Sequence, residues 1–377
     1  MAKDLSPSTH PLTPPLTEEE WHFWLRLLRS RRVGIATFFR LMEEHGSAEH
    51  ALEALPQIAA DAGVKNYQPC DEKTVRDELH RAKLARATPI AIGSAQYPPI
   101  LAEIPDPPPI LWCTGDICLL QKKPIAVVGA RNASSLGTRM AKKLAKDLGA
   151  HDFTITSGLA RGVDTAAHVA ALETGTIAVM AGGVDVIYPK ENTVLAQEIE
   201  EKGLLISEMP VGTVPQARHF PNRNRIISGL ARATIVVEAA AKSGSLITAR
   251  TALDQGRDVL SVPGHPFDAR ASGCNMLIRD GAMLVRGAQD VIDALEEPPV
   301  EKKVMKTKTK SPAIAPNTAV LHAQILDRLG PSPIAEDQLI RDLGAPASTV
   351  SPEISALELD GKIQRQPGGL LSRMVDA

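Results

Sequence analysis

Short apolar segments alternate with helical stretches between residues 125 and 285, and this alternation constrains the fold more than any other feature. The apolar segments are 125–129, 153–157, 176–181, 204–208, 234–239, 258–262 and 283–285. Continuous apolar strands that alternate with helices are typical of a parallel sheet with both faces covered. The sequence therefore predicts an α/β fold, with a Rossmann-like doubly wound sheet over residues 120–296.

Helical patterns flank this region on both sides. Residues 17–88 predict a small all-helical domain, because Thr17 precedes three glutamates as a helix N-cap would, and Gly46 suits a helix end. Residues 318–377 predict three helices followed by a β-hairpin with a glycine turn, which is the arrangement of a winged helix.

Three further segments are expected to lack a core of their own. Residues 1–16 are rich in Pro, Ser and Thr, and we expect them to be disordered. Residues 89–119 contain a proline-rich stretch, which predicts an extended connection that cannot be helix. Residues 297–317 are basic and of low complexity, as in a solvated flexible linker.

Composition limits the possible classes of function. The net charge is −2, so nucleic acid would have to bind a local basic patch on a nearly neutral body. No apolar run approaches the ~20 residues that span a membrane, and the N-terminus lacks an apolar signal core. We expect a cytoplasmic protein without membrane contact. Its four scattered cysteines are expected to be reduced thiols rather than metal ligands.

The segment 218–230, RHFPNRNRIISGL, gathers cations around one aromatic ring. Arg218, Arg223 and Arg225 lie close in sequence to Phe220. Such a segment is too basic to be core, and cations with an aromatic between them suit a nucleic-acid backbone and a stacked base. We interpret these four residues as a nucleic-acid-binding surface.

The loop after the first predicted strand suits an anion. In GARNASSLG (129–137), Arg131 offers forked donors, and Ser134 can cap a helix whose N-terminus presents free N–H groups. The dinucleotide fingerprint G-x-G-x-x-G fails because Arg131 stands at its second glycine, so no nicotinamide cofactor is expected.

The next two loops allow more than one interpretation. In SGLARGVDTAAH (157–168), Arg161 can contact a phosphate or form a salt bridge with Asp164, and His168 is expected to be packed rather than catalytic. In AGGVDVIYPKEN (181–192), Lys190 beside an aromatic residue suits a nucleotide, although the loop can equally be a plain turn.

A later loop resembles the first. EAAAKSGSLITA (238–249) places Lys242, Ser243 and Gly244 at the start of a helix, which again suits an anion. Loops at the carboxyl ends of parallel strands meet at one edge of the sheet. The sequence therefore predicts a positive groove at that edge.

Catalytic patterns are not evident. The chain lacks the nucleophile elbow G-x-S-x-G and the phosphate-loop pattern G-x-x-x-x-G-K-[ST]. Asp185, Glu208 and Glu238 lie near predicted strand ends, where structural capping or pairing is favoured over catalysis. The sequence predicts a protein that is not an enzyme.

A series of motifs resembles one family. GARNASSLG, SGLARGVDTAAH, GGVDVIYPKEN, FPNRNRIISGL, SGSLITA, VPG and GCNMLIRDGA occur in the order typical of the DNA-processing DprA family, also called Smf. The flanking regions match a common version of that family, which has an N-terminal SAM-like or helix-hairpin-helix-like domain and a C-terminal winged helix.

The resemblance implies a non-enzymatic protein that binds single-stranded DNA. It implies protection of incoming DNA in natural transformation, loading of the recombinase RecA, and homodimerisation through the Rossmann-like domain. Carried over by motif, the candidate DNA contacts are Arg131, Lys190, Phe220, Arg223 and Arg225.

Two alternatives remain open. A nucleotide-processing enzyme, such as a nucleotide phosphoribohydrolase, would be expected to show P-G-G-x-G-T-x-x-E where this chain reads KSGSLITA. A winged helix that prefers duplex DNA is disfavoured because its third helix is poor in cations, and a protein-interaction role for that domain is at least as well supported.

Overall fold

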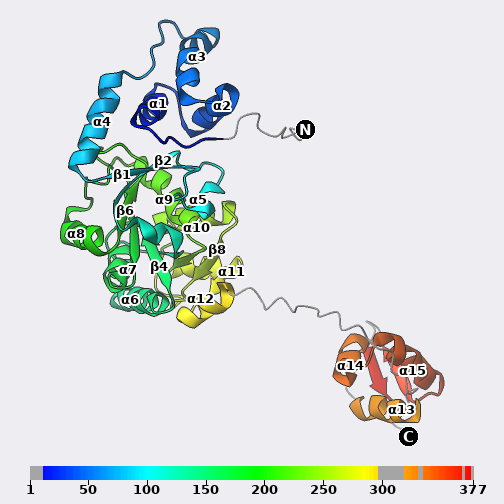
Figure 1. Ribbon diagram of the computed structural model, residues 1–377. Coiled ribbons are helices and arrows are strands. Elements are labelled where there is room, and N and C mark those ends of the chain that lie inside the picture. Colours follow the sequence, from blue (N-terminus) through cyan, green and yellow to red (C-terminus); the bar gives the residue numbers. More distant parts are fainter. Residues whose placement is uncertain (1–11, 296–317, 330–333, 367–369, 375–377) are drawn as a thin grey trace. The chain divides into compact units, whose positions relative to one another are not determined.

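The computed structural model describes residues 12–295, 318–329, 334–366 and 370–374 (Figure 1). The chain divides into two compact units, Met1–Pro299 and Val300–Ala377. Residues 1–11 of the segment expected to be disordered (1–16) and the linker expected at 297–317 lie outside the described residues. Among the described residues, every helix is too short or too polar to cross a membrane.

Four helices form the N-terminal domain, as the sequence predicts. They are α1 (Glu18–Arg29), α2 (Ile35–His45), α3 (Ala48–Asp61) and α4 (Glu72–Leu84). Thr17 caps α1 in a capping box, since its side chain accepts from the Glu20 N–H and its own N–H donates to the Glu20 carboxylate. Gly46 ends α2 in the left-handed region at φ 76°.

A nine-stranded sheet forms the centre of the first unit, in the order β1-β2-β6-β5-β4-β3-β7-β8-β9. The strands from β6 to β9 in that order are parallel, while β1 and β2 form an antiparallel edge. The seven predicted strands are confirmed as β3 (Lys123–Val128), β4 (Phe153–Ser157), β5 (Thr176–Val179), β6 (Leu204–Ser207), β7 (Ala233–Val236), β8 (Asp258–Ser261) and β9 (Met283–Leu284). Two further strands, β1 (Thr88–Ala91) and β2 (Ile110–Gly115), were not predicted.

The segment 89–119 is more structured than the sequence predicted. It contributes β2 and most of β1 to the sheet, then a short helix η1 (Ile117–Gln121), and the expectation that it cannot be helix is wrong. One turn, α5 (Pro99–Ala102), begins at a proline. Proline is tolerated there because the first N–H groups of a helix have no partner within the helix.

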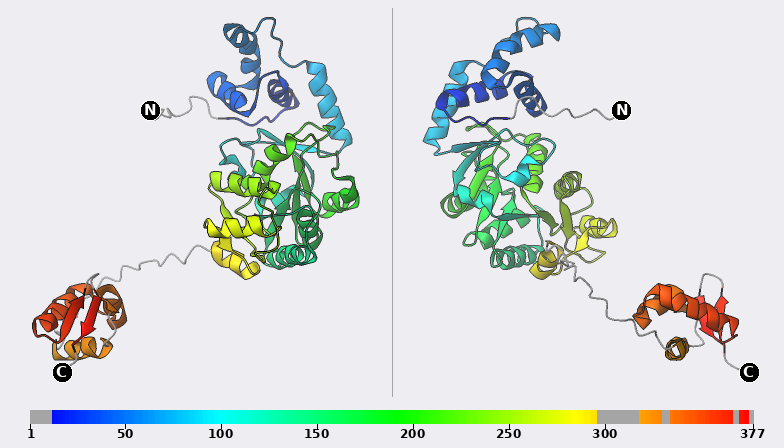
Figure 2. Two further views of the ribbon diagram at one scale, coloured as in Figure 1. Left: turned by 180° about the vertical axis from the view of Figure 1, so that it is seen from behind. Right: turned by 45° about the vertical axis from the view of Figure 1, so that its right-hand side comes forward.

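Helices cover both faces of the sheet (Figure 2). Successive side chains of each strand point to opposite faces. Ile125 and Val127 pack with α6 (Ser135–Gly149), α7 (Val163–Ala171) and α12 (Ala288–Leu295). Ala126 and Val128 pack on the other face, whose core includes α9 (His219–Leu230), α10 (Gly244–Asp254) and α11 (Ser272–Arg279). The turn η2 (Lys190–Asn192) and α8 (Thr193–Lys202) follow β5 along the chain.

The second unit is a winged helix, as the sequence predicts. Its helices are α13 (Thr318–Arg328), α14 (Glu336–Leu343) and α15 (Ala347–Leu359), and its antiparallel sheet orders β10 (Ile334–Ala335), β12 (Leu370–Arg373) and β11 (Ile363–Gln366). Leu321, Ile325, Leu339, Ile354 and Leu371 are buried in one core.

Candidate nucleic-acid interface

The sheet reverses its winding direction between β3 and β7. From β3 the chain continues outward through β4, β5 and β6, whereas from β7 it continues the other way through β8 and β9. In open α/β sheets, ligands bind in the crevice beyond such a switch point. A cavity of about 600 Å³ lies here, and it is lined by Val128–Asn132, Ala160, Asp164, Phe220, Arg223, Asn224, Ile227, Ala240, Lys242–Ser245, Thr248 and Arg270.

An aromatic ring with two arginines over it marks one end of this cavity. The Cζ atoms of Arg131 and Arg223 lie 5.6 Å and 6.0 Å from the centroid of the Phe220 ring. The Tyr188 ring lies 5.5 Å from the same centroid, tilted by 58°. The sequence suggested an aromatic in the Tyr188 loop but did not pair it with Phe220, because 32 positions separate them. The two rings form a platform with cations beside it.

Arg223 is buried, which contradicts the prediction that its segment is too basic to be core. It extends inward from α9, and its Nη1 donates to the Val179 carbonyl at 3.1 Å. A Cβ on Gly158 would lie 1.5 Å from that Nη1, so only glycine leaves room for the guanidinium. Burial lowers the pKa of Arg223 to about 10, opposed by the nearby charge of Asp164. Arg223 therefore remains a cation at neutral pH.

One interpretation of the sequence predicts a salt bridge between Arg161 and Asp164. The structure gives the two side chains different partners. The buried carboxylate of Asp164 accepts from the backbone N–H groups of Gly158 at 3.1 Å and Ala160 at 3.3 Å. Burial raises the pKa of Asp164, and the charge of Arg223 opposes that effect. Arg161 instead forms an exposed ion pair with Glu191, beside a cavity of about 60 Å³ next to the aromatic platform.

His168 is fully buried, which confirms that it is packed. Its Nε2 accepts from the Leu159 N–H at 3.4 Å, and its Nδ1 lies 2.7 Å from the Thr176 hydroxyl. Burial, together with the charge of Arg223, lowers the pKa of His168 to about 3. The neutral ring fixes the loop after β4, in which Leu159 adopts a left-handed backbone at φ 55°.

The N-terminus of α6 is already occupied, so the prediction that it is free to bind an anion is wrong. The Glu238 carboxylate accepts from the Ser134 N–H at 2.8 Å and from the Ser134 hydroxyl. The Ser134 side chain also accepts from the Gly137 N–H at 3.0 Å, as an N-cap does. Glu238 follows β7 and is 104 positions from Ser134, so no local sequence signal could reveal this contact.

The N-terminus of α10 is open, in agreement with its predicted character. Ser243 caps the helix by accepting from the Ser245 N–H at 3.3 Å. A Cβ on Gly244 would meet nothing within 4 Å, and Lys242 is exposed beside it. Lys242, Ser243 and Gly244 line the same cavity as Arg131 and Phe220.

Arg225 points away from this cavity, contrary to its predicted exposure. Its guanidinium is buried, forms an ion pair with Glu208, and donates from Nη1 to the Asp106 carbonyl at 2.7 Å. These contacts tie α9 to the segment before β2. Lys190 and Arg218 are exposed, each two positions in sequence from a ring of the platform, and neither lines the two cavities. Arg218 Nε donates to His219 Nε2 at 3.5 Å.

The three carboxylates near strand ends have structural partners, as the capping interpretation favours. Glu208 pairs with Arg225, Glu238 caps α6, and Asp185 accepts from the Gly212 N–H at 2.8 Å. Among the described residues, no three His, Cys, Asp or Glu side chains are placed to hold a metal ion.

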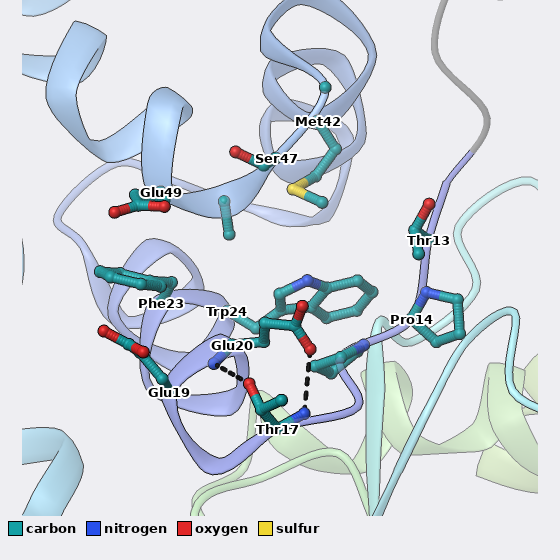
Figure 3. Close-up of a pocket in the computed structure, with 13 residues that line it drawn as sticks. Thr13, Pro14, Thr17, Glu19, Glu20, Phe23, Trp24, Met42, Ser47 and Glu49 are labelled. Atoms are coloured by element: carbon teal, nitrogen blue, oxygen red, sulfur yellow. Dashed lines mark hydrogen bonds between the residues drawn. The ribbon is translucent and has the colours of Figure 1, made fainter.

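A second cavity, in the N-terminal domain, has the opposite electrostatic character. It measures about 390 Å³, and Phe23, Trp24 and Met42 line it together with Glu19, Glu20 and Glu49 (Figure 3). Carboxylates at the edge of an apolar pocket repel phosphate. The cavity at the switch point is therefore the better candidate for nucleic acid.

Family models match three parts of the chain. A model described as DNA recombination-mediator protein A matches residues 88–296. A DprA-like N-terminal HHH domain matches residues 18–81, and a DprA winged helix domain matches residues 309–369.

Curated relatives and solved structures agree with these matches. The DNA processing protein DprA of Streptococcus pneumoniae is 43% identical over 246 residues, which cover 64% of this chain and 87% of the relative. Protein Smf of Escherichia coli is 37% identical over 286 residues, which cover 74% and 76% of the two chains.

A crystal structure of Streptococcus pneumoniae DprA superposes with a TM-score of 0.58 at 35% identity, and covers 73% of this chain and 93% of that one. A Helicobacter pylori DprA structure that describes a single-stranded DNA binding mode has a TM-score of 0.51 at 30% identity, and covers 55% of this chain and 95% of that one. The chain belongs to the DprA (Smf) family of DNA recombination mediators.

Proposed function

We propose that this protein binds single-stranded DNA in the cavity at the switch point and is not an enzyme. The proposal rests on the surroundings of the Phe220 ring. Arg131 and Arg223 lie over this ring and Tyr188 lies beside it, at the carboxyl ends of parallel strands. Single strands bind without a sequence code when bases stack on aromatic rings and cations follow the phosphates. The relative from Helicobacter pylori, whose structure describes such binding, supports the same use of this fold.

In this proposal, Arg223 and Arg131 have different roles in binding DNA. Arg223 is held by Val179 and gives the floor of the cavity a fixed positive charge. Arg131 is exposed on the loop after β3 and can move to meet a phosphate. Lys242 extends the cationic surface toward the start of α10. The floor would therefore be ready before DNA arrives, and the edge would adapt to it.

We further propose that the protein acts as a homodimer and delivers its DNA to RecA, in natural transformation or homologous recombination. The edge strand β9 exposes Met283 and Leu284, and α10 exposes Ile247 and Leu253. Exposed apolar side chains on an edge strand and on a surface helix suit contact with another protein surface. Light scattering of wild type and Met283→Glu tests the dimer, and RecA filament assembly on coated single strands tests the delivery.

Fluorescence anisotropy with labelled poly-dT and an equal-length duplex, over a salt series, tests the DNA-binding proposal. We expect preference for the single strand and a slope of log affinity against log salt of about −0.7 per phosphate contacted. Phe220→Ala should weaken binding by about 1–3 kcal/mol, the usual value of one stacked base.

Arg232→Ala provides the matched control for Arg131→Ala. Arg232 is an exposed arginine just before β7, at the opposite edge of the sheet from the cavity. Equal affinities for Arg131→Ala, Arg232→Ala and wild type would contradict the proposed site. A preference of the wild type for duplex would contradict the proposed ligand.

Duplex binding by the winged helix is the weaker candidate. The helix α15 carries no lysine or arginine, and its Glu358 pairs with Arg365 of β11 at 3.3 Å. Loss of all DNA binding on removal of residues 297–377 would favour it over the cavity. Free base released from nucleoside monophosphates would instead support the nucleotide-processing alternative.

A further inference from the structure

Phe267 is the most exposed aromatic side chain of the chain. All Phe, Tyr and Trp residues lie in the described ranges, and only Tyr188 (51% exposed) and Phe267 (94% exposed) among them are exposed. Both follow strands at the same edge of the sheet. A ring this exposed is accessible for stacking against a flat ligand.

The loop that carries Phe267 is held by many hydrogen bonds. Asn275 clamps its base, because its side chain accepts from the Gly264 N–H at 3.1 Å and donates to the Gly264 carbonyl at 3.0 Å. At its tip, the Phe267 N–H donates to His265 Nδ1 at 3.3 Å, and the Asp268 N–H donates to the His265 carbonyl at 2.9 Å. The turn therefore directs the ring outward.

The surroundings of Phe267 favour a flat, anionic ligand. The His265 ring lies 5.5 Å from the Phe267 ring, tilted by 38°. Arg270 follows three positions later and forms an ion pair with Asp268 at 3.1 Å, which neutralises part of its charge and fixes its direction. Arg270 also lines the cavity that contains Phe220.

The order of the strands makes this loop an extension of the proposed DNA site. Across the neighbouring strands β5, β4, β3, β7 and β8, the loops carry Tyr188, Arg161, Arg131, Lys242 and Phe267 in turn. Neighbouring strands lie about 4.8 Å apart, so the loops extend over roughly 20 Å. In this order, an aromatic residue follows the first and the last of the five strands, and cationic residues follow the three strands between them.

We propose that Phe267, supported by His265, is a second base-stacking platform, on which a single strand continues from the Phe220 platform past Lys242 and Arg270. This inference rests on the proposed function, since it assigns a further part of the same DNA track. The ligand is single-stranded nucleic acid of any sequence, because every base has a face that can stack.

The test measures anisotropy with oligothymidylate of about 16 nucleotides, the upper end of the site size of comparable single-strand modules. Phe267→Ala should weaken binding by about 5- to 150-fold, which is the effect of losing one stacked base. Phe267→Trp should retain wild-type affinity, and its fluorescence should be quenched by DNA because the base covers the indole. Leu84→Ala, which removes a 72% exposed apolar side chain from the N-terminal domain, is the matched control.

The outcomes separate this inference from the proposed function. Suppose that the wild type binds single strands, that Phe220→Ala binds them more weakly and that Phe267→Ala binds them with wild-type affinity. The second platform is then wrong, and the first platform is supported. If wild type does not bind single strands, the proposed function itself fails. If Phe267→Ala changes only the oligomeric state measured by light scattering, the ring is a protein contact and the inference is overturned.

Discussion

Two helices begin at the same edge of the sheet with the same capping chemistry, yet their N-termini differ. At α6, Ser134 caps the helix and the Glu238 carboxylate supplies the anion that such an end attracts. At α10, Ser243 caps the helix, Lys242 lies beside it, and the end faces the cavity. A capping motif thus shows where an anion is favoured, but not whether the protein itself already provides it.

The contrast extends to the whole edge. On one side, polar groups that are buried or half-buried make hydrogen bonds within the protein, and we call this the filled side: Asp164, His168, Arg223 and Glu238. On the other, exposed or half-buried groups line the cavity, and we call this the open side: Arg131, Lys242, Ser243 and Gly244. Changes on the filled side should lower stability, and changes on the open side should lower DNA affinity.

The largest expected effect is a loss of unfolding free energy at low pH, caused by His168 on the filled side. His168 remains neutral in the folded protein to a pKa of about 3, whereas in the unfolded chain it binds a proton below about 6.5. The unfolded state therefore binds more protons between these values, and His168 reduces the unfolding free energy by up to about 1.4 kcal/mol for each pH unit lowered. Urea denaturation from pH 7 to pH 4 measures this slope.

His168→Gln provides the comparison for this slope. It removes the titrating ring, so its unfolding free energy should depend less steeply on pH below about 6.5, whatever its value at pH 7. Parallel pH profiles for the variant and the wild type would show that His168 is not responsible.

A smaller effect is expected at the end of α6. Glu238→Gln removes the internal anion and one acceptor, and should lower the unfolding free energy by about 1–3 kcal/mol. The freed helix end could then accept a phosphate, which would steepen the salt slope of DNA binding by about 0.7. Glu198→Gln, at an exposed carboxylate on α8, is the control. Unchanged stability in Glu238→Gln would remove the distinction between the two helix ends.

The smallest effect is expected on the open side. Lys242→Ala should leave stability unchanged and reduce the salt slope by about 0.7, because one phosphate contact is lost. Lys123→Ala is the control, since this exposed lysine starts β3 at the opposite edge of the sheet. Equal slopes for both variants would mean that the start of α10 does not contact DNA.

The sequence predicted what depends on local pattern. Apolar alternation predicted the strands and the parallel sheet, and the position after each strand predicted which loops meet. The depth of a charged side chain could not be predicted in this way. Arg223 and Arg225 can be buried because carbonyl groups distant in sequence, those of Val179 and Asp106, accept hydrogen bonds from their guanidinium groups. The same holds for Glu238, which could be placed near a strand end but not against Ser134.

The Glu238 cap has a consequence for ligand selection in the cell. Free mononucleotides carry compact, doubly charged phosphates, and a vacant helix end at a switch point is where such groups bind in many α/β proteins. Here that position already holds a carboxylate, which repels a second anion. A phosphate that enters the cavity is therefore directed away from the start of α6 and toward the open start of α10, where Lys242 lies.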